Sequence, residues 1–91
     1  MDLQDLRSRI DIIDDELIRL FERRMDVSAE IARCKKRHNI PVRDSAREQE
    51  ILGQIAGKVS EGRESSIAAL YSLLFELSRT EQNKIIGEEL T

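Results

Sequence analysis

The chain has 91 residues, which suits a single domain spanning residues 1–91, and a domain this small buries only a modest core. Its net charge of −3 gives no overall attraction to nucleic acid or to an anionic membrane, and no apolar run approaches the roughly 20 residues that span a bilayer. Cys34 is the single cysteine, which excludes an internal disulfide, and the charged N-terminus lacks the apolar segment of a signal peptide, so we expect a cytoplasmic protein.

The composition favours an all-α fold. Charged residues make up 36% of the chain, while four glycines and one proline leave few turns for a sheet protein. The pattern predicts a first helix over residues 3–37, which ends at "HNIP" because Pro41 disfavours a helical residue before it.

Two shorter helices are predicted after this proline. The second opens at "RDSAREQE" and fades near Gly57. Its N-cap is either Asp44 or Ser45, because Ser45 and Glu48 have the spacing of a capping box. The connection "GKVSEGRESS" then leads to a third helix from about residue 65 to near residue 90.

The first helix is too long for its own domain. At 1.5 Å per residue it is roughly 50 Å long, whereas a compact chain of this size has a radius of gyration of about 12 Å. Its apolar stripe would therefore lie partly in water, and a second chain placed antiparallel along it is the expected cover. The stripe consists of Leu3, Leu6, Ile10, Ile13, Leu17 and Leu20, and continues at Val27, Ile31 and Cys34.

An arginine interrupts this stripe. The next position of the repeat after Leu20 is Arg24. Lys35 follows 35 − 24 = 11 positions later, which places it about 20° from Arg24 around the helix axis and roughly 16 Å along it. Two long cationic side chains on one face could hold a small anion between them.

The third helix has a similar interruption. Its apolar stripe contains Tyr71 and Leu74, and Ser78 and Gln82 fall within the same face at i, i+4 spacing. Buried polar groups are costly without partners. Polar and cationic residues on inward faces of two helices therefore predict a polar cavity that binds a dianion.

Each of these residues also has a purely structural interpretation. Arg24 could extend out of the stripe or pair with an acidic residue of a neighbouring chain. Lys35 lies in "RCKKR", which could be a solvated helix end, and Ser78 could bond back to its own helix. The corresponding alternatives are solvent exposure for Gln82, capping for Glu48, a loop position for His38 and a core position for Cys34. The prediction of a site depends on their joint placement.

The side chains that perform nucleophilic or metal chemistry are scarce. One histidine, one cysteine and no serine–histidine–acid pattern offer little material for either. A reaction at this site would have to depend on positioning and electrostatics, and we expect neither a metal nor a cofactor.

A run of segments covers nearly the whole chain, from "LRSRIDIIDDELIRLFERR" through "EIARCKK" and "IPVRDSAREQEIL" to "ELSRTEQ". Together they resemble the all-α chorismate mutases, found as single enzymes and as fused domains in aromatic amino-acid biosynthesis. In that family, 11 positions separate the site's arginine from its lysine, so the resemblance selects Arg24, with Lys35, over its neighbour Arg23. The positions that match the family's site are Arg7, Arg24, Lys35, Asp44, Arg47, Glu48, Ser78 and Gln82.

The resemblance implies an intertwined antiparallel helical-bundle homodimer with three helices per chain and two shared active sites. In each site, chorismate would rearrange to prephenate without a cofactor. By resemblance, Arg24 and Arg7 of the partner subunit hold the two carboxylates, while Lys35 and Gln82 donate to the ether oxygen. Arg47 and Ser78 assist the carboxylates, and Glu48 with the segment at Asp44 meets the ring hydroxyl.

The sequence leaves two other functions open. The sequence also resembles, more weakly, the isochorismate pyruvate lyases, which form salicylate on the same scaffold. Glu48 directly after Arg47 favours the mutase, because the contact it offers to a hydroxyl suits chorismate. A non-catalytic helical dimerisation module is the third interpretation, but its stripe should be apolar throughout, and Arg24 argues against that.

Overall fold

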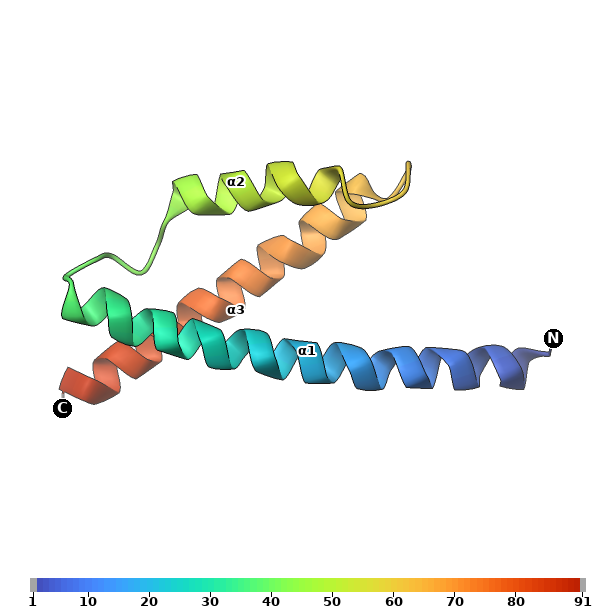
Figure 1. Ribbon diagram of the computed structural model, residues 1–91, viewed down its shortest axis with the longest axis horizontal. Coiled ribbons are helices and arrows are strands. Elements are labelled where there is room, and N and C mark those ends of the chain that lie inside the picture. Colours follow the sequence, from blue (N-terminus) through green and yellow to red (C-terminus); the bar gives the residue numbers. More distant parts are fainter. Residues whose placement is uncertain (1, 91) are drawn as a thin grey trace.

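The structure is a computed structural model that describes residues 2–90. It consists of α1 (Leu3–Arg37), α2 (Ser45–Ala56) and α3 (Glu64–Leu90), and no strand occurs within residues 2–90 (Figure 1). The prediction of an all-α chain with three helices and a long first helix is confirmed. The homodimer stays a prediction.

Local hydrogen bonds define the two ends of α1. The Asp2 side chain accepts from the backbone N–H of Asp5 at 2.9 Å, and the Asp5 side chain accepts from the N–H of Asp2, so the two form a capping box. At the other end, Asn39 has a positive φ of 54° and the N–H of Ile40 donates to the carbonyl of Lys35 at 2.8 Å. The helix therefore ends at "HNIP", as predicted.

The N-cap of α2 is Asp44. Its carboxylate accepts from the backbone N–H of Arg47 at 3.0 Å, and Ser45 is the first helical residue. The alternative capping box from Ser45 to Glu48 is wrong. Asp44 accepts from the N–H of Arg47 at the start of α2, and the Glu48 side chain bonds to Arg79 of α3 instead of turning back to Ser45.

The third helix lies between the other two. Both α1 and α2 pack against α3, while the N-terminal half of α1 projects beyond them (Figure 1). The chain is 54 Å long with a radius of gyration of 16.6 Å, so the predicted overhang is confirmed. Six apolar side chains along it are 43–60% exposed: Leu3, Leu6, Ile10, Ile13, Leu17 and Leu20.

The core of one chain is small and lies at the other end of α1. Ala32, Ile55 and Phe75 are its buried apolar residues. The interpretation of Cys34 as a core residue is wrong, because this side chain is exposed beside His38. Within residues 2–90, no helix combines the length and the apolar character needed to cross a membrane.

Ala32 provides a test of the packing between α1 and α3. It is fully buried, so a larger side chain has no room unless the helices separate. We expect Ala32→Leu to lower the free energy of unfolding by about 1–3 kcal/mol in urea titrations followed by circular dichroism. The control is Ala46→Leu on the exposed face of α2, which should stay close to the wild type. Equal stability of the two variants would contradict this packing.

Candidate active site

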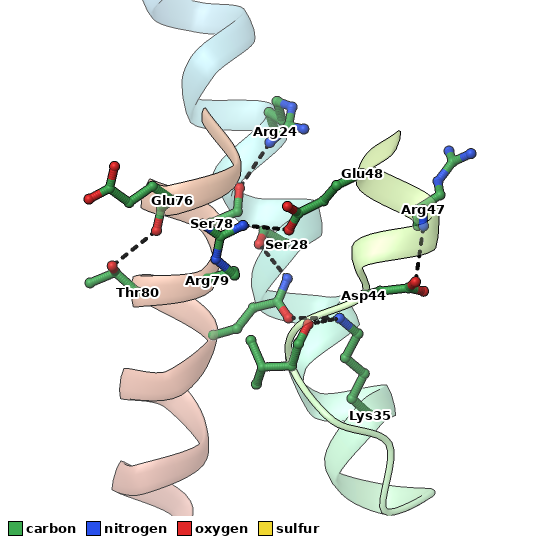
Figure 2. A network of polar contacts seen from close by, with 12 residues as sticks. Arg24, Ser28, Lys35, Asp44, Arg47, Glu48, Glu76, Ser78, Arg79 and Thr80 are labelled. Carbon is green, nitrogen blue, oxygen red and sulfur yellow. Dashed lines mark hydrogen bonds and ion pairs between the residues drawn. The ribbon is translucent and has the colours of Figure 1, made fainter. Parts of the chain in front are cut away.

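All three helices contribute to a cavity of about 420 Å³, which is large enough for a small organic ligand. Seven of the eight predicted site residues line it: Arg24, Lys35, Asp44, Arg47, Glu48, Ser78 and Gln82. Figure 2 shows how the polar side chains of α1 and α3 meet across this space.

Arg24 turns from the apolar stripe of α1 toward α3. Its Nη1 donates to the Oγ of Ser78 at 2.9 Å, and its Cζ lies 5.8 Å from the ring centroid of Tyr71 and 6.0 Å from that of Phe75. Ser78 is only 8% exposed. A hydroxyl and two aromatic faces thus hold the partly buried guanidinium against α3, which differs from the outward extension that the sequence also allowed.

Lys35 and Gln82 meet at the centre of a buried polar network. Lys35 Nζ donates to the backbone carbonyl of Val42 at 2.6 Å and to Gln82 Oε1 at 3.2 Å. Gln82 Nε2 donates to Ser28 Oγ at 2.9 Å. Gln82 is 6% exposed, so it is not a solvent-facing amide. Lys35 is partly buried and its ammonium bonds within the chain, so it is not simply a solvated helix end.

Sequence reasoning missed two residues of the site. Ser28 lies one helical turn after Arg24, and this i, i+4 spacing was the signal that could have identified it. Arg79 directly follows Ser78 and forms an ion pair with Glu48 at 2.5 Å between Nη1 and Oε2. No pattern in the sequence distinguishes Arg79 from an ordinary surface arginine, because its partner is 31 positions away.

Two of the predicted residues do not direct a charged group into the cavity. Asp44 lines it but uses its carboxylate to cap α2. Arg47 pairs with Glu50 at 2.7 Å, both side chains are 56% exposed, and in Figure 2 its guanidinium points away from Glu48. Arg47 therefore lines the cavity without directing its guanidinium into it.

Arg7 is not brought to the cavity. It lies on the exposed overhang, 24 − 7 = 17 positions before Arg24, or roughly 26 Å along the helix axis. An arginine side chain does not cover that distance. In a single chain, the site therefore contains seven of the eight predicted residues.

Positive charge is in excess around the cavity. Apart from Asp44 and Arg47, its lining contains three cationic side chains, Arg24, Lys35 and Arg79, and one anionic side chain, Glu48. The balance is 3 − 1 = +2, which complements a ligand with two negative charges. Within residues 2–90, no group of three or more histidine, cysteine, aspartate or glutamate residues is placed to hold a metal ion.

Known proteins match most of the chain. The family model described as chorismate mutase type II matches residues 6–83. A bifunctional chorismate mutase/prephenate dehydratase of Buchnera aphidicola is 38% identical over 88% of this chain, and that of Escherichia coli is 29% identical over 93%. The chain spans about a fifth of such relatives, 22% of each of these two.

One relative has nearly the same length. The 4-amino-4-deoxychorismate mutase of Streptomyces venezuelae is 31% identical over 99% of this chain and 90% of its own length. No solved structure matches the chain. The family model covers well over half of the residues, including all eight predicted site positions, so the chain belongs to the type II chorismate mutase family.

Proposed function

We propose that this chain, as one domain over residues 1–91, is a chorismate mutase that converts chorismate to prephenate in aromatic amino-acid biosynthesis. The reaction is a Claisen rearrangement within one molecule: a carbon–oxygen bond breaks while a carbon–carbon bond forms, with no proton transfer. The observation that carries the proposal is the placement of Lys35 beside Gln82 in a cavity with an excess of positive charge. The family provides independent support, and a cytoplasmic location remains part of the proposal.

Lys35 and Gln82 each have a donor left for a ligand. The ammonium of Lys35 has three hydrogens and uses two of them on Val42 and Gln82. The amide nitrogen of Gln82 has two and uses one on Ser28. Both remaining donors would serve the ether oxygen, which gains negative charge as its bond breaks. Such donors stabilise the transition state more than the substrate, and this difference accelerates the reaction.

The carboxylates of the substrate would meet the other polar groups. Ser78 accepts from Arg24, so its own hydroxyl hydrogen is available to a carboxylate, as are the remaining N–H groups of Arg24. Arg47 would reach the ligand only after leaving Glu50. Glu48, together with the segment at Asp44, would meet the ring hydroxyl, and the Glu48 carboxylate would accept from it.

The second arginine would come from another copy of the chain. The overhang of α1 exposes an apolar stripe that a second α1, placed antiparallel, would cover. The same pairing would bring Arg7 of one chain toward Arg24 of the other. We therefore propose an intertwined homodimer in which each active site contains residues from both chains.

Product analysis tests the proposed reaction directly. The protein should convert chorismate to prephenate and should form no salicylate from isochorismate, with products separated by liquid chromatography and identified by mass. Salicylate as the main product would favour the lyase. No product from either compound would favour the non-catalytic module.

Lys35→Ala tests the role of the lysine. Removing one donor to a developing oxyanion typically lowers the rate by about 10²–10³-fold, so kcat should fall by that order while the helical spectrum is retained. The control is Lys58→Ala in the connection between α2 and α3, where an exposed lysine is removed outside the cavity. Turnover of Lys35→Ala within a few-fold of the control would exclude the proposed role.

Mixing two inactive variants tests the shared site. Arg7→Ala and Arg24→Ala homodimers should each be nearly inactive, since each substitution affects both sites. A heterodimer has one site with both substitutions and one intact site. Random exchange from equal amounts gives half heterodimers, so about a quarter of the wild-type activity should return.

Sedimentation equilibrium should first give the dimer mass, and native mass spectrometry should confirm exchange. An exchanged mixture that stays inactive would contradict the model.

A further inference from the structure

Arg79 and Glu48 form an ion pair that lies at the wall of the cavity. Arg79 belongs to α3 and Glu48 to α2, and their Nη1 and Oε2 atoms are 2.5 Å apart. Their side chains are 26% and 19% exposed, whereas those of the Arg47–Glu50 pair on α2 are 56% exposed. Figure 2 shows the Arg79 guanidinium next to the Glu48 carboxylate. The pair is thus partly shielded from solvent, and both of its residues line the cavity.

This pair leaves Glu48 able to accept one more hydrogen bond. One carboxylate oxygen of Glu48 accepts from Arg79, while the other has lone pairs for a ligand. A hydroxyl donates to such an oxygen without adding charge. A ligand ammonium would also donate, but it would lie close to the Arg79 cation, which already neutralises Glu48.

Building on the proposed function, we propose that Arg79 is a specificity-determining residue. By neutralising Glu48, it makes the site prefer a neutral donor on the substrate ring, the hydroxyl of chorismate, over a cationic one, the ammonium of 4-amino-4-deoxychorismate. Primary alkyl amines are protonated near neutral pH, so the two compounds differ there by one positive charge. Arg79 acts through Glu48 and needs no contact with the reacting atoms.

Two simpler roles for Arg79 make different predictions. If Arg79 bound a substrate carboxylate, its loss would lower kcat/KM for both compounds equally, because both have the same two carboxylates. If it only tied α2 to α3, its loss would lower stability and affect both compounds alike. The ratio of kcat/KM for the aminated compound to kcat/KM for chorismate cancels these common effects and isolates the interaction at the ring position.

The experiment measures this ratio at pH 7 for the wild type and four variants. Arg79→Gln removes the cation and should raise the ratio roughly tenfold, the effect of one nearby unit charge in a partly shielded site. Glu48→Gln keeps the cation without its partner and should lower the ratio below that of the wild type. Arg79→Lys restores the charge and should return the ratio to within about threefold of the wild type.

The fourth variant is the control. Lys84→Gln removes an exposed cation from the same helix, which matches the change in net charge, and should leave the ratio unchanged. An unchanged ratio in a folded Arg79→Gln protein would overturn the proposal, as would a change of equal size in Lys84→Gln. If the wild type converts neither compound, the proposed function fails, and the ratio of dissociation constants from calorimetry on the same proteins decides the role of Arg79.

Discussion

The buried amide of Gln82 is the interaction on which the rest of the site depends. It lies on α3, yet both partners that satisfy it, Ser28 and Lys35, are on α1. An amide without partners at this depth would destabilise the fold. The two helices are therefore held in a register in which Lys35 also reaches Val42 and the polar groups face one another. The same contacts that stabilise the crossing of α1 and α3 arrange the donors of the cavity.

The central place of α3 follows from this arrangement. It packs against both other helices, and successive residues on it, Ser78 and Arg79, contact Arg24 of α1 and Glu48 of α2. Each cation that enters the cavity thus has a hydrogen-bonding partner on another element. In the part of the chain that the structure describes, no buried side-chain nitrogen or oxygen lacks a hydrogen-bond partner. This explains how a domain with only a few buried apolar residues contains so many polar groups.

The overhang of α1 has a different physical origin. Within residues 2–90, nothing covers the stripe from Leu3 to Leu20, because α2 packs against α3 alone and α3 crosses only the C-terminal half of α1 (Figure 1). A helix of this length is stable in water mainly through the packing of its apolar face. The exposed stripe and the distance of Arg7 from the cavity are thus two results of the same geometry, and both point to a second chain.

Helical periodicity, caps and the proline were enough to predict the three helices, the length of α1 and the inward direction of Arg24, Lys35, Ser78 and Gln82. These features are local, because spacing along one helix determines which residues share a face. The spacing after Arg24 places Ser28 on the same face, but its partner Gln82, the ion pair of Arg79 and the choice of Asp44 as the cap were decided by tertiary structure. Which polar residues become partners depends on how far each helix slides and rotates against the next, and residues such as Glu48 and Arg79 are brought together across 31 positions only when the helices pack.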